Sequence, residues 1–510
     1  MAEKILKQYE ILSEGITLKI KVLETDADFV KHYFLGLPEF GEGTKALLNS
    51  LKPVLISDPK IKAETMLDSK KVKELKDKIR ERAAAVIAVQ LPKLSKENQS
   101  VLASILLADM LGLGEIEFIL DDPNLEEIVI NSAKDPVWVF HKEFGWLKSN
   151  VLIKNEEEIH NFSSIIARRV GKQITILTPL LDAHLISGDR VNATLKPISA
   201  QGNTITIRRF RRDPWTVIDF IKNKTVNSEL MALVWIAMQY EMNMILSGGT
   251  ASGKTSFLNI CLPFIQPNHR VLTMEDTREI NLPDFMHWVP MSSREPNPEG
   301  KGKVELLDLL VNSLRMRPDR IIVGEIRRQR EAEVMFEAMH TGHSVYTTFH
   351  ANTADETIRR FTNPPIDIPP AMLEAVHLNV VLFRNRRLGI RRVLELAEYV
   401  PERRGDTSIV KANVLYRWRA TDDTISKTAE SIRLMDELSL HTGLGPNEIQ
   451  KDLDQKKMIL DWMVEKNIAG IYNVGKIISE YYKDPEYILE KAKKNSNPGE
   501  LIEAKKTAEN

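Results

Sequence analysis

One segment of the 510-residue chain constrains its fold more than any other. Residues 248–255 read Gly-Gly-Thr-Ala-Ser-Gly-Lys-Thr and fit the pattern G-x-x-x-x-G-K-[ST] at every position. A short apolar run precedes the segment, and a helical pattern that starts near Lys254 follows it. Such a loop directs successive backbone N–H groups and the positive end of a helix dipole at one anion. This context predicts a phosphate-binding loop and disfavours the alternative, a glycine-rich turn with an accidental lysine.

The residue types in this loop predict ATP and Mg²⁺ as the bound cofactors. Lys254 places a positive charge between the β- and γ-phosphates, and the Thr255 hydroxyl is a ligand for Mg²⁺. The predicted cofactor-binding residues form one continuous segment: Gly248, Gly249, Thr250, Ala251, Ser252, Gly253, Lys254, Thr255 and Ser256.

The pattern around the loop predicts a parallel α/β sheet. Short apolar runs at residues 244–247, 270–274, 320–324 and 344–348 alternate with helical patterns. Continuous apolar strands with intervening helices are typical of a parallel sheet that is covered on both faces.

The remaining segments predict further domains, because a chain of this length is too long for one ordinary core. Residues 116–207 mix short strand patterns with one helical pattern, and Pro214 interrupts regular structure soon after them. The predicted division is a largely helical N-terminal extension (1–110), an α+β domain (111–209), a linker (210–228), an α/β domain (229–424) and a helical C-terminal region (425–510).

Carboxylates follow two of the predicted strands. Glu325 comes directly after the run that ends at Gly324, and Glu275 and Asp276 end another run. Ligands of parallel sheets bind beyond the carboxyl ends of the strands. We therefore expect Glu325 to orient a water molecule or contact the metal, and Glu275 and Asp276 to reach Mg²⁺. A helix-capping glutamate is the alternative for Glu325.

Two histidines, His343 and His350, flank one more predicted strand. Two histidines and two carboxylates also form a zinc ligand set, but a nucleotide site with Mg²⁺ needs no zinc. The favoured interpretation is that both donate hydrogen bonds to phosphate or to Glu325. A buried structural histidine is the alternative, and it is a stronger rival for His343 than for His350.

Four motifs in this order resemble those of the secretion ATPase superfamily of type II secretion, type IV pili and the archaellum, and its archaeal GspE-like branch above all. They are residues 248–255, 273–276, 321–327 and 341–352, with further similarity at 181–184, 188–193 and 206–210. The resemblance implies a homohexameric ring whose protomers combine a PAS-like α+β N-terminal domain with a RecA-like P-loop NTPase motor domain. The four-cysteine zinc insertion of many bacterial relatives has no counterpart, because the chain has one cysteine, Cys261.

The resemblance also implies residue roles. Glu325 matches the catalytic glutamate, the pair at 275–276 the acidic motif, and the histidines at 343 and 350 the histidine motif. Arg190 and Arg208 match N-terminal-domain arginines that reach ATP, where a guanidinium neutralises charge on the transferring phosphoryl group. Arg209 or Arg211 is an alternative to Arg208. A basic surface patch is the rival interpretation for residues 208–212, and above all for Arg211 and Arg212.

The predicted function is an ATP-hydrolysing motor for protein secretion or pilus-like filament assembly. The alternatives are an archaellum motor and a nucleic-acid uptake or translocation ATPase. A net charge of -1 disfavours a nucleic-acid partner. No apolar run is long enough to cross a bilayer. We therefore expect a cytoplasmic protein, peripheral on the cytoplasmic face of the membrane, that contacts a polytopic platform protein and acts indirectly on pilin-like or exported proteins.

Overall fold

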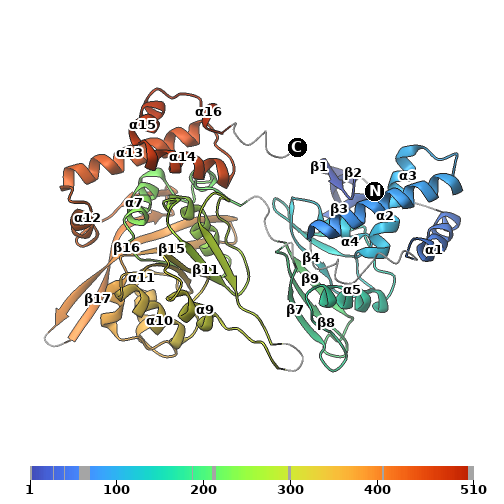
Figure 1. The fold of residues 1–510 in the computed structure, drawn as a ribbon, viewed down its shortest axis with the longest axis horizontal. Coiled ribbons are helices and arrows are strands. Elements are labelled where there is room, and N and C mark those ends of the chain that lie inside the picture. The colour runs from blue at the N-terminus through green and yellow to red at the C-terminus, as the bar shows by residue number, and fades with distance from the viewer. Residues whose placement is uncertain are drawn as a thin grey trace. The chain divides into compact units, whose positions relative to one another are not determined.

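The structure is a computed structural model that describes residues 3–26, 28–38, 41–56, 69–185, 188–209, 214–296, 300–404 and 407–502. Its internal contacts divide the chain into two compact units, Met1–Arg211 and Arg212–Asn510. Each unit contains one nine-stranded sheet and its own hydrophobic core (Figure 1).

The sheet of the first unit has the order β1-β2-β3-β6-β5-β4-β9-β8-β7. All its neighbouring strands are antiparallel except β3 and β6. The strands are β1 Glu3–Ser13, β2 Ile16–Thr25, β3 His32–Gly36, β4 Leu125–Ile130, β5 Trp138–His141, β6 Gly145–Ser149, β7 Leu180–His184, β8 Arg190–Thr194 and β9 Thr204–Arg208.

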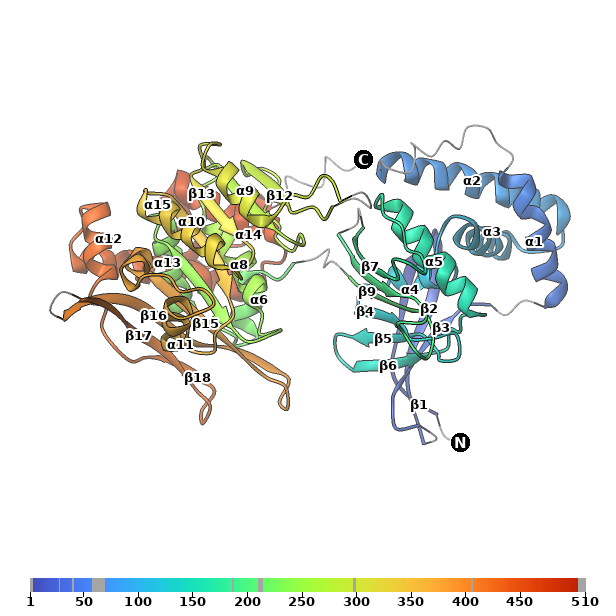
Figure 2. The same cartoon turned by 90° about the horizontal axis from the view of Figure 1, so that it is seen from below.

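Five helices accompany this sheet, and α5 packs against it (Figure 2). Helix α3 begins after Ser95, whose side chain accepts a hydrogen bond from the Asn98 N–H, and it ends at Gly112. The helices are α1 Glu42–Ile56, α2 Ser69–Gln90, α3 Lys96–Leu111, α4 Ile116–Leu120 and α5 Glu156–Arg169.

The prediction of a separate, largely helical extension over residues 1–110 is wrong for the first three strands. β1, β2 and β3 continue the sheet of the predicted α+β domain. Strand β2 alternates buried and exposed residues along most of its length, and Leu18, Ile20 and Val22 join the core of that domain. The segment therefore completes the first unit instead of standing apart from it.

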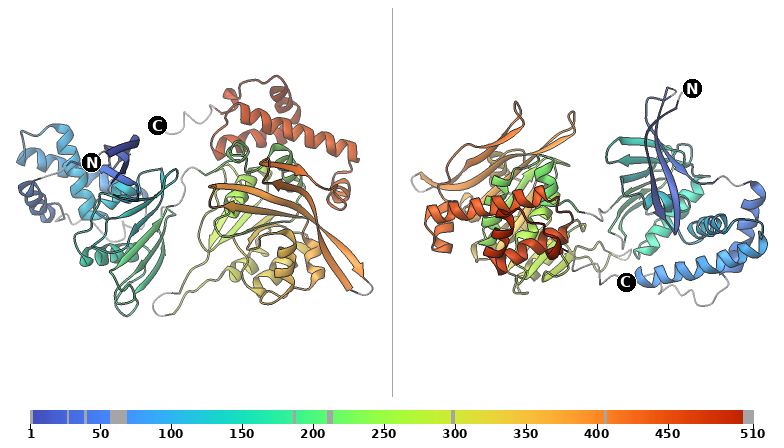
Figure 3. Two further views of the ribbon diagram at one scale, coloured as in Figure 1. Left: turned by 180° about the vertical axis from the view of Figure 1, so that it is seen from behind. Right: turned by 90° about the horizontal axis from the view of Figure 1, so that it is seen from above.

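The sheet of the second unit has the order β12-β11-β13-β14-β10-β15-β16-β17-β18. Its first six strands are parallel, as predicted, and β16 to β18 add an antiparallel extension that the sequence pattern did not predict. The β16–β17 hairpin reaches beyond the rest of the sheet (Figure 3). The strands are β10 Met244–Gly248, β11 Val271–Glu275, β12 Trp288–Ser292, β13 Arg320–Val323, β14 Ser344–Phe349, β15 Leu378–Asn385, β16 Ile390–Arg404, β17 Thr407–Arg419 and β18 Thr424–Lys427.

Helices cover both faces of this second sheet, because its parallel strands are apolar on both sides. Figure 1 shows α13 and α14 on one side and α10 and α11 on the other. The helices are α6 Val217–Lys222, α7 Ser228–Gln239, α8 Lys254–Cys261, α9 Leu306–Ser313, α10 Gln329–His340, α11 Ala354–Thr362, α12 Leu434–Thr442, α13 Pro446–Glu465, α14 Ile471–Lys483, α15 Pro485–Lys493 and α16 Gly499–Ile502.

The C-terminal helices are an integral part of the second unit. Trp235 of α7 stacks on Phe264, with 5.1 Å between the ring centroids, and its indole N–H donates to the Tyr482 hydroxyl of α14 at 2.8 Å. These residues share one core with α8, the helix that follows the glycine-rich loop. Among the described helices, none combines the length and the apolar character that a bilayer crossing requires.

Candidate nucleotide site

The glycine-rich loop curls tightly between β10 and α8. Gly253 has a φ of +97°, in the region that favours glycine. At Gly248, where φ is +155°, a Cβ atom would lie 2.4 Å from the Ser252 hydroxyl and 2.6 Å from the Leu382 carbonyl oxygen. Only glycine fits such a space, so the sequence at these positions fixes the shape of the loop.

Lys254, the first residue of α8, folds back over this loop. Its ammonium group donates to the carbonyl oxygens of Gly248 at 3.0 Å and Gly249 at 3.2 Å, and lies 3.3 Å from His350 Nδ1. Burial lowers the pKa of Lys254, while the charge of the nearby Glu325 opposes that shift. The cation is therefore held where the loop would receive phosphate.

Glu325 and His350 meet because they follow neighbouring parallel strands, β13 and β14. Their side chains are in direct contact, with 2.6 Å between His350 Nε2 and a Glu325 carboxylate oxygen. Burial lowers the pKa of His350, the positive charge of Lys254 adds to that effect, and Glu325 opposes it. Lys254, His350 and Glu325 thus form a continuous polar chain at the carboxyl edge of the sheet.

Glu275 ends β11 and is almost fully buried, with 2% of its surface exposed. One carboxylate oxygen accepts hydrogen bonds from the backbone N–H groups of Glu279 at 2.8 Å and Ile280 at 3.0 Å. The other oxygen is buried and has no hydrogen-bond partner among the described residues. Burial raises the pKa of Glu275 to about 7, so this carboxyl group is poised to change its charge near neutral pH.

Arg327 links Glu325 to Asp276, and the sequence-based predictions did not include this role. Its guanidinium donates to Glu325 at 2.8 Å and to Asp276 at 3.0 Å. Asp276 is exposed and also accepts a hydrogen bond from the Ser293 hydroxyl at 3.0 Å. The signal was present, because Arg327 closes the motif Gly-Glu-Ile-Arg at the end of the apolar run.

His343 does not reach this cluster, which corrects its predicted sensor role within the protomer. It precedes β14, whereas His350 follows it, and the six residues between them span about 20 Å of strand. The His343 ring instead lies 3.3 Å from the Ala338 carbonyl oxygen and from the Thr341 hydroxyl. His343 therefore lies beyond the amino end of β14, whereas the cluster lies beyond the carboxyl ends of the parallel strands.

The predicted arginines belong to the first unit. Arg190 forms an exposed ion pair with Asp182 at 2.7 Å, and Arg208 ends β9 with its side chain exposed. The Arg209 guanidinium donates to the backbone carbonyl of Asp122. Residues 211 and 212 lie outside the described residues. A role of Arg190 or Arg208 at the nucleotide stays a prediction.

The donor set of the second unit fits a triphosphate with Mg²⁺. Within the part of the chain that the structure describes, one Glu275 carboxylate oxygen and the Ser252 hydroxyl are buried and have no hydrogen-bond partner, so both are available to ordered water or to a ligand. Thr255 and Ser256 occupy the first turn of α8, where a metal-binding hydroxyl and backbone N–H groups are expected.

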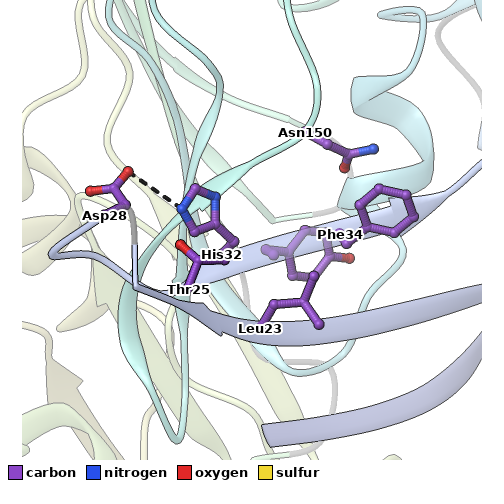
Figure 4. A pocket seen from close by; sticks show the side chains of 7 residues that line it. Leu23, Thr25, Asp28, His32, Phe34 and Asn150 are labelled. Carbon is purple, nitrogen blue, oxygen red and sulfur yellow. Dashed lines mark ion pairs between the residues drawn. The ribbon is translucent and has the colours of Figure 1, made fainter. Parts of the chain in front are cut away.

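A second concave feature belongs to the first unit. A cavity with a volume of about 330 Å³ is lined by residues of β2 and β3 and by the segments beside them (Figure 4). His32 lies 3.3 Å from Asp28, whose carboxylate also accepts a hydrogen bond from Lys148 at 2.6 Å. The rest of the wall combines the side chains of Leu23, Tyr33 and Phe34 with the polar side chains of Thr25 and Asn150. This mixed lining, which includes the Asp28 carboxylate, does not resemble a phosphate site.

Fold and site together define a RecA-like α/β protein with a P-loop sequence motif. A family model described as Type II/IV secretion system protein matches residues 147–388. An uncharacterized protein of Methanocaldococcus jannaschii is 35% identical over 402 residues, which cover 77% of this chain and 71% of that protein. The chain therefore belongs to the type II/IV secretion ATPase superfamily.

Two further relatives are more distant. The conjugal transfer protein TrbB of Rhizobium radiobacter is 28% identical over 304 residues, 58% of this chain and 90% of that protein. Among solved structures, the Legionella pneumophila ATPase DotB aligns with a TM-score of 0.38 and 21% identity, over 70% of this chain and 92% of that one.

Proposed function

We propose that the chain binds and hydrolyses ATP with Mg²⁺ and uses the energy as a mechanical motor for protein secretion or pilus-like filament assembly. The observation that carries the proposal is the polar chain of Lys254, His350 and Glu325 beside a glycine-rich loop. A loop alone supports nucleotide binding, whereas a carboxylate next to it supports turnover.

The residues divide the work of hydrolysis. Residues 248–256 bind the phosphates, and a phosphate oxygen gives Lys254 a stronger partner than the carbonyls it contacts now. Glu325 accepts a hydrogen bond from the attacking water, and its contacts with His350 and Arg327 hold the carboxylate in position. The water oxygen forms a bond to the γ-phosphorus as the bond between the γ-phosphorus and the bridging oxygen breaks, giving ADP, phosphate and one proton released from the water. Mg²⁺, when bound through Thr255, neutralises charge on the phosphates.

The proposal that ATP binding and hydrolysis drive movement of the protein rests on the family to which the chain belongs. Arg190 and Arg208 would bring positive charge to the bound nucleotide. ATP binding and product release would then move the first unit with respect to the second. The functional form would be a homohexamer at the cytoplasmic face of a membrane, in contact with a polytopic platform protein.

Nucleic-acid translocation is the second candidate, and an archaellum motor is a third that would use the same residues. The second is favoured by relatives such as TrbB, named for conjugal transfer, and is disfavoured by the net charge of -1. Stimulation of ATP turnover by DNA, weakening steeply as salt rises, would support it.

The experiment is phosphate release by the purified full-length chain with Mg²⁺ and ATP, together with light scattering. We expect turnover by the wild type, none by Lys254→Ala, and an oligomer in the presence of nucleotide. Absence of turnover in the wild type at every protein concentration contradicts the enzymatic proposal. A strict monomer contradicts the ring, and failure to co-purify any integral membrane protein from the native host contradicts the secretion role.

A further inference from the structure

Four polar side chains from different elements of the second unit are buried together at the base of the phosphate-binding loop. They are Ser247 of β10, Thr357 of α11, Asn379 of β15 and Tyr399 of β16, and all four are fully buried. We call them the buried network. Apolar side chains of the same shape would stabilise such a core about as well, so packing alone does not account for the network.

The hydrogen bonds of the buried network run from β10 to the first turn of α11. The Ser247 hydroxyl lies 2.8 Å from the Thr357 hydroxyl and donates to the Asn379 side-chain oxygen at 2.9 Å. The Asn379 side-chain nitrogen donates to the Tyr399 hydroxyl at 2.7 Å. Because burial raises the pKa of Tyr399, this hydroxyl keeps its proton and donates to the Ala354 carbonyl oxygen at 3.4 Å.

The start of α11 directly follows the segment that carries His350. Thr353 is the N-cap of α11, and its carbonyl oxygen accepts a hydrogen bond from the Thr357 hydroxyl at 2.9 Å. Only two residues separate Thr353 from His350. On the other side of the network, Ser247 immediately precedes the first glycine of the loop. The buried network therefore joins the base of the loop to the base of segment 350–353.

The loop and segment 350–353 also meet at their far ends. Lys254 Nζ lies 3.3 Å from His350 Nδ1, and a Cβ atom built on Gly249 would lie 3.3 Å from the Asn352 side-chain oxygen. His350 is partly exposed, whereas the buried network is closed to water. Hydrogen bonds are stronger in such a low-dielectric interior. The network is therefore the firmer of the two connections between the loop and the segment.

We propose that the buried network positions segment 350–353 against the phosphate-binding loop, so that His350 and its contact Glu325 stand where hydrolysis requires them. This inference rests on the proposed function and adds positioning residues to it. A displacement of about 1 Å at a reacting group can lower a rate about a hundredfold. The network therefore supports the rate of hydrolysis more than the affinity for ATP, because the backbone N–H groups of the loop bind the phosphates without it.

The test compares Thr357→Val and Tyr399→Phe with wild type, by single-turnover phosphate release and by equilibrium binding of ATP. Each substitution removes one hydroxyl of the network and keeps the shape of the rest of the side chain. We expect the rate of phosphate release to fall about tenfold in each variant, and the Kd of ATP to stay within about threefold of wild type. In steady-state turnover, kcat should fall while KM changes little.

Three controls distinguish a positioning role from a general loss of stability. Thr357→Ser keeps the hydroxyl and should retain a rate within about twofold of wild type. Ser313→Ala should leave the rate unchanged, because it removes a buried hydroxyl of α9 that donates to the Leu310 carbonyl oxygen at 2.7 Å, outside the network. Thermal unfolding verifies that each variant folds, and Tyr399→Phe carries the test if Thr357→Val does not fold.

The outcomes are distinct. A rate within about twofold of wild type in the variant that carries the test overturns the positioning role. A loss in Thr357→Ser equal to that in Thr357→Val also overturns it, because altered packing would then explain both. In either case, turnover by the wild type leaves the proposed function standing. A wild-type protein without turnover refutes the proposed function itself.

Discussion

Glu275→Gln offers a test of the site that does not depend on catalysis. The side chain is buried, and one of its oxygens accepts two backbone hydrogen bonds that a glutamine oxygen can keep. The substitution therefore removes the titration of the group while preserving its shape and those two contacts. Any pH-dependent difference in stability between variant and wild type then reports the cost of charging Glu275.

The magnitude follows from the pKa. Burial raises the pKa of Glu275 from 4.5 to about 7 in the folded protein, which corresponds to about 3 kcal/mol. Because the folded-state pKa exceeds the unfolded value, the folded protein binds more protons between these two values. The group therefore lowers stability as pH rises through this window, and the full cost is present above pH 7. Glu275→Gln should match wild type near pH 4 and exceed it by about 3 kcal/mol near pH 8.

The assay is thermal unfolding of the nucleotide-free full-length chain across this pH range, following the transition of the second unit. At roughly 2 °C per kcal/mol for a domain of this size, the midpoint should rise by about 6 °C near pH 8. The exposed Glu337 of α10 supplies a control, because the side chain at this position contacts water both before and after the substitution Glu337→Gln. A constant difference between Glu275→Gln and wild type from pH 4 to pH 8 would refute the reasoning, because the burial would then carry no electrostatic cost.

Three other predictions concern residues outside the polar chain. Arg190→Ala and Arg208→Ala should each slow phosphate release at least tenfold without lowering the melting temperature, and unchanged rates in both would exclude an arginine finger. His343→Ala should leave the Kd of ATP unchanged in equilibrium binding, because that ring lies at the opposite edge of the sheet. Asp122→Ala should destabilise the first unit by about 3 kcal/mol in chemical unfolding. The reason is that the buried Tyr33 hydroxyl, 2.9 Å from the Asp122 carboxylate, loses its hydrogen-bond partner. A destabilisation below about 1 kcal/mol would contradict this prediction.

The second unit was the most predictable part of the fold. Its parallel strands are short, apolar runs, and the loop after β10 fits the pattern G-x-x-x-x-G-K-[ST] at every position. Glu275, Glu325 and His350 could be placed at one edge of the sheet, because the carboxyl ends of parallel strands meet there. The prediction for His343 was wrong because its motif spans the whole of β14. The two histidines of the motif therefore lie at opposite ends of that strand.

Long-range pairing was the least predictable part. Strand β2 alternates buried and exposed residues along most of its length, but nothing local indicates that β3 pairs with β6 across more than a hundred residues. The antiparallel strands β16 and β17 were missed because charged residues interrupt their apolar positions, especially at 402–404. Arg327 was overlooked because its role depends on Asp276, which lies 51 positions earlier in the chain.

The most direct test of the account is single-turnover phosphate release by Glu325→Gln, measured beside equilibrium binding of ATP. Glutamine preserves the size of the side chain but removes the negative charge that orients the attacking water. We expect an ATP Kd within about threefold of wild type and a rate of phosphate release at least a hundredfold lower. Phosphate release near the wild-type rate, with ATP bound normally, would contradict the assignment of Glu325 and with it the proposed mechanism.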